Sequence, residues 1–185
     1  MEERGFLEPE WDHKTGLIPP VYPDMEADMY PRSPYRVTPG YLVEYFAGNE
    51  TRIRLLKLFF DFRARIYRAD AGSGFQWVNG SFVEDKERIR GDKPKDIDVV
   101  TFLERVPSDN LLADKRAMKR LYSVDPHWVI FSECSNAGLV SRTAYWYSLW
   151  GHQRGSFQWK GFLEVPLDEK LDADAIELLS RKENR

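Results

Sequence analysis

The chain has 185 residues, of which 42% are hydrophobic and 31% charged, and its formal net charge at pH 7 is −3. These values are typical of a globular protein with one real core, and they exclude the disordered, fibrous and membrane-protein classes. The small negative charge also excludes a global electrostatic footprint for nucleic acid, although 27 basic residues leave room for local patches. The single cysteine excludes a disulfide framework, and the lack of any long apolar run predicts a cytoplasmic protein that does not enter a membrane.

Residues 1–37 are predicted to form an extended arm. They contain six of the eleven prolines and show no sustained helical or strand period. Aromatic residues favour packing of this arm on the body of the protein, because isolated aromatic exposure is unfavourable, although a partner surface is the alternative. These residues are Phe6, Trp11, Tyr22, Tyr30 and Tyr35. The remaining residues, 38–185, are predicted to form a single domain.

Two helices are predicted next. Thr38 followed by Pro39 is typical of an N-cap with proline in the first turn, and it predicts a short helix to about residue 47. Apolar residues at helical spacing predict a longer helix over 50–68. Its basic residues are interpreted as a solvated face, with a phosphate- or RNA-contacting face as the alternative. They are Arg52, Arg54, Lys57, Arg63, Arg65 and Arg68.

The rest of the chain alternates between predicted strands and helices. Strands are predicted over 75–78, 96–103, 124–131 and 160–167, and Pro126 favours an edge or a strand start for the third of them. Helices are predicted over 108–122, 141–150 and 172–181. This order predicts an α/β (α+β) fold, in which a small mixed sheet is flanked by helices on one side and wrapped by the Pro-rich arm.

One pair of segments carries chemistry. Asp96 and Asp98 are two residues apart in a predicted strand, so their carboxylates point to the same side, roughly 6–7 Å apart. Two carboxylates this close repel unless a cation lies between them, and Mg²⁺ prefers carboxylate and phosphate oxygens. Gly80 and Ser81 end the preceding strand, where a backbone without a Cβ and a hydroxyl could receive a triphosphate.

The segments VNGSF (78–82) and PKDIDVV (94–100) resemble the signature of the DNA polymerase β-like nucleotidyltransferase superfamily. Within it, the chain looks closest to a small prokaryotic group with a GSF(V)…P-x-DIDVV core and later segments like 150–154 and 160–161. The resemblance implies the nucleotidyltransferase fold, bound Mg²⁺ or Mn²⁺, and an NTP as substrate. It also implies RNA (tRNA) or protein as the acceptor, and a place in a bacterial toxin–antitoxin or phage-defence module with a cognate protein partner or a homo-oligomer.

The resemblance calls for a third carboxylate on a neighbouring strand, for which Asp125 is the candidate and Glu104 and Glu133 are substitutes. Ser81 leads into Phe82 rather than into the small residue and arginine that often follow in small active transferases. Phosphate contacts are therefore expected from other cationic residues. The candidates are Lys86, Arg88, Arg142, Arg154 and Lys160.

Two alternatives accompany this interpretation. A catalytically inactive interaction module, such as an antitoxin or an assembly subunit on the same fold, is the first. A nucleophile–base pair of Cys134 with His127 or His152 is the second, but no family signature surrounds these residues.

Overall fold

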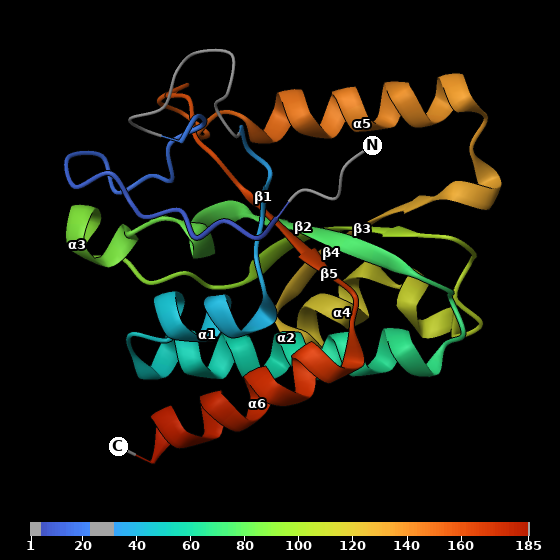
Figure 1. Ribbon diagram of the computed structural model, residues 1–185, viewed down its shortest axis with the longest axis horizontal. Coiled ribbons are helices and arrows are strands. Elements are labelled where there is room, and N and C mark those ends of the chain that lie inside the picture. The colour runs from blue at the N-terminus through green and yellow to red at the C-terminus, as the bar shows by residue number, and fades with distance from the viewer. Residues whose placement is uncertain (1–4, 23–31, 185) are drawn as a thin grey trace.

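The computed structural model describes residues 5–22 and 32–184, which form a five-stranded mixed sheet and six α-helices (Figure 1). The strands are β1 (Tyr35–Arg36), β2 (Gly74–Asn79), β3 (Ile97–Leu103), β4 (Val124–Ile130) and β5 (Leu163–Pro166). The helices are α1 (Pro39–Phe46), α2 (Glu50–Arg68), α3 (Lys86–Arg90), α4 (Lys115–Tyr122), α5 (Asn136–Trp150) and α6 (Glu169–Glu183). The predicted α+β class is confirmed.

The sheet has the strand order β1-β5-β2-β3-β4. Strands β2 and β3 are antiparallel, as are β2 and β5, whereas β3 runs parallel to β4 and β1 parallel to β5. Strand β4, which contains Pro126, lies at one edge of the sheet, as the proline predicted. The two-residue strand β1 was not predicted, because it is too short to show a period.

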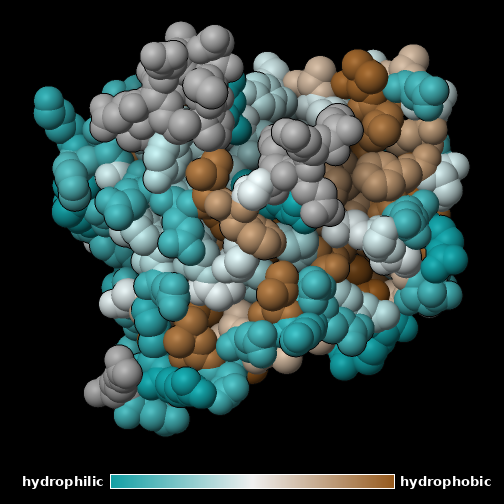
Figure 2. Space-filling model, in the orientation of Figure 1, coloured by the Kyte–Doolittle hydropathy of each residue, from teal (hydrophilic) through white to brown (hydrophobic). Residues whose placement is uncertain are grey.

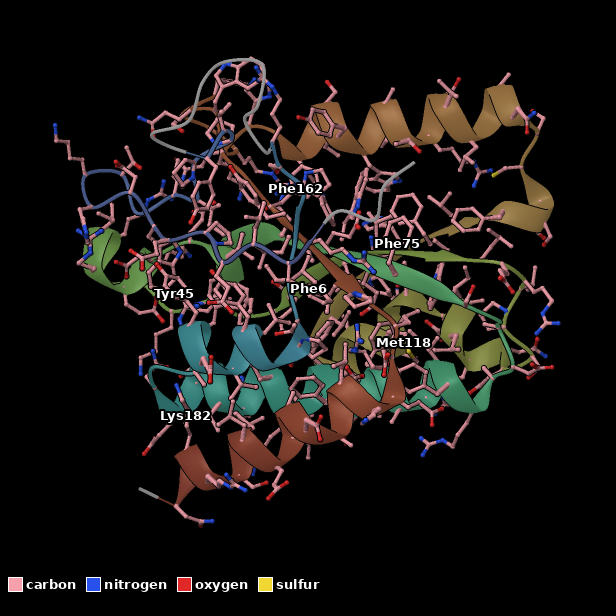
Figure 3. All side chains as sticks on the ribbon, in the orientation of Figure 1. Phe6, Tyr45, Phe75, Met118, Phe162 and Lys182 are labelled. Carbon is pink, nitrogen blue, oxygen red and sulfur yellow. The ribbon has the colours of Figure 1, made fainter. Side chains whose placement is uncertain are left out.

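Both faces of the sheet are covered. One face packs against α1, α2, α4 and α6, and the other lies under α5 (Figure 1). Phe75 and Phe162 lie on the α5 side, whereas Met118 of α4 lies on the opposite side (Figure 3). The prediction of helices on one side only was therefore wrong. The physical reason is that neighbouring residues of β3, such as Val99 and Val100, are both fully buried, so each face needs a cover.

The predicted starts of the first two helices are confirmed. The Thr38 side chain accepts a hydrogen bond from the amide of Tyr41, and Pro39 lies in the first turn of α1. Asn49 caps α2 by accepting from the amide of Arg52 at 3.1 Å. Both caps satisfy backbone donors that a helix leaves unpaired at its start.

The prediction of a solvated basic face on α2 was wrong for two of its six residues. Arg52 is 2% exposed and Arg63 is fully buried. Arg63 pairs with the Asp172 carboxylate of α6 at 2.6 Å and donates to Gln76 Oε1 of β2 at 2.7 Å. Burial of a charge requires a partner, and α6 supplies one that is distant in sequence.

Several predicted boundaries moved, and one helix was not predicted. The helix predicted over 108–122 is a 3-10 turn over 110–113 followed by α4, because the Asp114 side chain caps a new helix start. The helix predicted from 141 begins at Asn136, where Ser135 caps it. Helix α3 was not predicted, and it lies between the strands predicted over 75–78 and 96–103.

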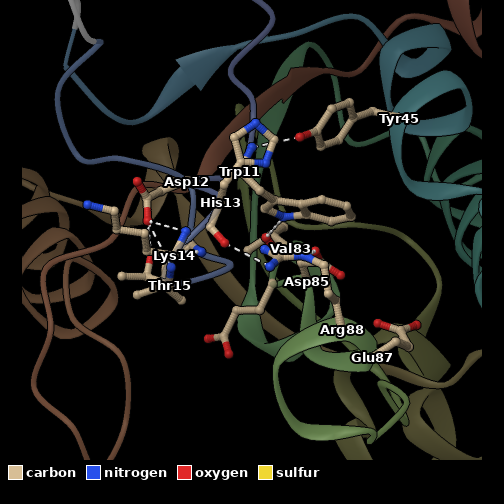
Figure 4. Close-up of polar contacts among 12 residues, drawn as sticks. Trp11, Asp12, His13, Lys14, Thr15, Tyr45, Val83, Asp85, Glu87 and Arg88 are labelled. Carbon is tan, nitrogen blue, oxygen red and sulfur yellow. Dashed lines mark hydrogen bonds and ion pairs between the residues drawn. The ribbon is translucent and has the colours of Figure 1, made fainter.

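The described part of the arm packs against the rest of the chain. Trp11 donates from Nε1 to the Val83 carbonyl at 2.8 Å, and its amide donates to the Tyr45 hydroxyl (Figure 4). Arg88 of α3 donates to the His13 carbonyl at 2.7 Å (Figure 4). Tyr30, another aromatic residue of the arm, lies outside the described residues.

Helix α5 leaves many apolar side chains in contact with solvent. Figure 2 shows apolar surface gathered at the upper right, over this helix. Val140, Tyr145 and Leu149 of α5 are more than half exposed, and so are Phe157 and Trp159 in the loop that follows. Within 5–22 and 32–184, no helix is both long and apolar enough to cross a membrane.

Candidate functional site

The site is a row of polar side chains across three adjacent strands. Asp98 of β3 pairs in register with Asn79 of β2 on one side and with Asp125 of β4 on the other. Asp96 precedes β3 by one residue and has the same strand parity as Asp98. The parallel pairing of β3 with β4 therefore places Asp125, the candidate third carboxylate, beside Asp98.

The Gly80 turn closes one side of this row. Strand β2 ends at Asn79, and a 3-10 turn over Gly80–Val83 begins at once. Gly80 has φ +78°, and a Cβ on it would lie 1.8 Å from Asp98 Oδ2. Glycine is thus required both by the backbone conformation and by the close approach of the Asp98 carboxylate. The Ser81 hydroxyl forms no hydrogen bond with any described residue, so it is available to a ligand.

The surroundings of Asp98 disfavour its charged form. Burial first, and then the charges of Asp96 and Asp125, raise the pKa of Asp98 from 3.8 to about 6. The cationic side chains of Lys160 and Lys119 oppose this rise. At neutral pH Asp98 is therefore ionised at a cost, which a bound cation would remove.

Two lysines of α4 currently pair with this cluster. Lys119 Nζ lies 2.6 Å from Asp96 Oδ2, and Lys115 Nζ lies 2.6 Å from Asp125 Oδ1. The ion pair with Asp96 raises the pKa of Lys119. Asp125 Oδ1 is buried and accepts no well-aligned hydrogen bond from a described residue, although Lys115 lies within ion-pair distance of it. Sequence reasoning missed both lysines, although their spacing of four in a predicted helix before the Asp125 strand was a usable signal.

The residues present fit a divalent cation. Three carboxylates supply hard oxygen donors, and the buried Asn79 Oδ1 beside Asp98 accepts no hydrogen bond from a described residue. In the part of the chain that the structure describes, no group of three or more His, Cys, Asp or Glu side chains is arranged to hold a metal ion, and lysines pair with two of the carboxylates. Cation binding would therefore require these side chains to exchange partners.

Lys160 lies within the site but is held by protein. Its Nζ is 2.7 Å from Glu84 Oε1 and 3.3 Å from the Gly80 carbonyl, and the side chain is 5% exposed. Burial lowers the pKa of Lys160, and the neighbouring Glu84 carboxylate opposes this. Gln153 donates to the other oxygen of Glu84 at 2.8 Å. As it stands, Lys160 braces the Gly80 turn rather than offering a free ammonium to phosphate.

The Gly80 turn is also braced from the opposite side. Arg52 donates to the carbonyls of Phe82 and Glu84 and forms a 2.7 Å ion pair with Glu87 of α3. The hydrogen bonds from Arg52 and Asn49 lower the pKa of Glu87 to about 2, despite the opposing effect of burial. Sequence reasoning placed Arg52 on a solvated face and missed this role.

The other basic residues predicted to contact phosphate have no contact with the carboxylate row among the described residues. Lys86 forms an ion pair with Asp92 at 3.4 Å, and Arg88 binds Asp85 and the arm. Arg142 and Arg154 are exposed and form no hydrogen bond or ion pair with a described residue.

The substitutes for the third carboxylate lie elsewhere. Glu104 follows β3 at the end opposite Asp98 and accepts a hydrogen bond from the Ser73 hydroxyl. Glu133 lies beyond the far end of β4. Strand register therefore favours Asp125.

The nucleophile–base alternative gains no support from geometry. The ring of His127 is tilted against Trp146 and its Nε2 contacts Lys115, and the ring of His152 is tilted against Trp159. Among the described residues, no hydrogen bond joins the Cys134 thiol to either histidine.

The carboxylate row and the Gly80 turn both lie within a recognised family match. The model described as "Family of unknown function (DUF6932)" matches residues 9–166. The matched span ends before α6 begins and includes all the residues of the row. No curated protein and no solved structure matches the chain.

Proposed function

The chain belongs to this family, DUF6932, and we propose that it is a metal-dependent nucleotidyltransferase that transfers a nucleotide from an NTP to a hydroxyl of RNA or protein. The observation that carries the proposal is the pairing of Asp98 with Asp125 across parallel strands, with Gly80 against the Asp98 carboxylate. The resemblance to the DNA polymerase β-like superfamily rests on the same segments and points the same way.

The three carboxylates and the Gly80 turn each have a role in this proposal. Asp96, Asp98 and Asp125 would hold Mg²⁺ or Mn²⁺, which supplies neutralisation of the triphosphate and polarisation of the attacking hydroxyl. Asp125, at the edge strand, would accept the proton of the acceptor hydroxyl as its oxygen bonds to the α-phosphorus of the NTP and pyrophosphate leaves. Gly80 and Ser81 offer backbone and hydroxyl donors to the triphosphate oxygens.

The buried network explains how the site keeps its shape. On one side Lys160 donates to the Gly80 carbonyl and pairs with the Glu84 carboxylate, and on the other side Arg52 donates to the Phe82 carbonyl. Preorganised donors lose little entropy when a ligand binds, so this bracing favours triphosphate recognition.

The test is Mg²⁺-dependent NTP binding, measured by calorimetry, together with transfer of label from each α-labelled NTP to total tRNA or lysate protein. Asp96→Ala with Asp98→Ala is expected to abolish both signals while the circular dichroism spectrum is unchanged. A matched control is Asp61→Ala with Asp174→Ala, which removes two exposed carboxylates from α2 and α6. Equal NTP affinity in the wild-type protein and the site variant would count decisively against the proposal.

A second candidate, a non-catalytic interaction module such as an antitoxin or assembly subunit, is favoured by the exposed apolar side chains of α5. Exposed apolar patches of this kind often mark protein interfaces. This candidate predicts a stable complex with a cognate partner or a second copy, and no label transfer from any NTP. Size-exclusion chromatography with light scattering, combined with the transfer assay, separates the two.

A further inference from the structure

Helix α4 differs in charge from the rest of this weakly acidic chain. Its eight residues, KRAMKRLY, include four basic residues and no acidic one. Lys115 and Lys119 lie one turn apart on one side of the helix, about 6 Å along its axis, and Arg116 and Arg120 form the neighbouring row. Two parallel rows of cations therefore run along this helix.

The first row borders the carboxylate site. Lys115 and Lys119 reach Asp125 and Asp96, yet their own side chains remain 48% and 54% exposed. Ion pairs this exposed contribute about 0–1 kcal/mol, so they are readily exchanged. A divalent cation at the carboxylates would compete with both ammonium groups for the same oxygens.

The second row faces solvent. Arg116 and Arg120 are exposed, and neither forms a hydrogen bond or ion pair with any described residue. Guanidinium groups bind phosphate oxygens in a bidentate manner. Because α4 has no acidic residue, no carboxylate of this helix competes for these two arginines. Release of the two lysines would add two more cations beside these arginines.

We propose that α4 is a docking surface for the phosphates of a single-stranded nucleic acid, and that divalent cations strengthen this binding by releasing Lys115 and Lys119 from the carboxylates. The proposal rests on the proposed function, in which RNA is one of the two acceptors. It selects nucleic acid over an acidic protein because a strand carries a phosphate at every nucleotide, which matches four cations gathered on one helix.

The sign of the cation effect makes the proposal specific. Added salt normally weakens the binding of a protein to nucleic acid, because the cations compete for the phosphates. Here Mg²⁺ at constant ionic strength is expected to raise the affinity. The probes are labelled single-stranded oligouridylate and oligothymidylate, measured by fluorescence anisotropy, so that RNA and DNA are compared directly.

Two double variants separate the rows. Arg116→Gln with Arg120→Gln is expected to lower affinity about tenfold or more and to reduce the slope of log affinity against log salt by about 1.4. Lys115→Gln with Lys119→Gln is expected to remove the Mg²⁺ enhancement. The matched control, Arg54→Gln with Arg181→Gln on α2 and α6, is expected to stay within about twofold of the wild-type protein, as surface changes away from a site usually do.

Defined outcomes overturn the proposal. Weaker binding in Mg²⁺, unchanged binding by the α4 arginine variant, or equal competition by oligoglutamate would each do so. NTP binding without strand binding leaves nucleotidyl transfer standing and removes the α4 surface. Mg²⁺-enhanced strand binding without NTP binding would leave the α4 surface standing and remove nucleotidyl transfer.

Discussion

Replacement of Asp98 by Asn is expected to stabilise the metal-free protein at neutral pH while it abolishes metal binding. Burial, followed by the charges of Asp96 and Asp125, raises the pKa of Asp98 from 3.8 to about 6. One pKa unit corresponds to about 1.4 kcal/mol, so the ionisation of Asp98 lowers the free energy of unfolding by about 3 kcal/mol. Asparagine has nearly the same shape and carries no charge.

The dependence on pH follows from the direction of this shift. Because the folded state binds the Asp98 proton more tightly than the unfolded state, wild-type stability falls as pH rises from about 4 to about 6. The gain from Asp98→Asn is therefore about 3 kcal/mol well above pH 6 and close to zero below about pH 4.

Urea unfolding followed by tryptophan fluorescence, with a chelator present, measures this gain at both ends of the pH range. Asp61→Asn, an exposed carboxylate on α2, is the control and should change stability by less than about 0.5 kcal/mol. Addition of Mg²⁺ should stabilise the wild-type protein and leave the Asp98→Asn variant unchanged. Destabilisation above pH 6, or an equal effect at both pH values, would refute the reasoning.

Two further predictions concern the Gly80 turn. Gly80→Ala is expected to destabilise the protein by more than Gly91→Ala. Both glycines have positive φ, but a Cβ at Gly80 would press against Asp98, whereas a Cβ at Gly91 would meet no described atom within 4 Å beyond its chain neighbours. Urea unfolding should show about 1 kcal/mol for Gly91→Ala and at least twice that for Gly80→Ala, and equal values would contradict the close approach. Lys160→Met is expected to cost about 3–5 kcal/mol, since it leaves the Glu84 carboxylate buried without its cation. Lys160→Met with Glu84→Leu should recover part of that loss in the same assay, and no recovery would mean that the pair does not act as a unit.

The local features of the site could be predicted from sequence because they depend on short spacings. Residues two apart in a strand share a face, which placed Asp96 and Asp98 together, and a Gly-Ser pair after a strand indicated the turn. Side-chain partners could not be predicted in the same way. Lys86 and Lys160 were expected on phosphate, yet each has a carboxylate partner, Asp92 for the first and Glu84 for the second.

The sequence by itself determined the α+β class, the capped starts of α1 and α2, and the common strand face of Asp96 and Asp98. All of these follow from spacings of a few residues. Only the tertiary structure decided that Asp125 stands beside Asp98, because the register of two parallel strands is set by pairing between segments joined through a helix. It likewise decided that lysines of that helix, α4, pair with the carboxylates, since the helix must be placed before its side chains can be assigned partners.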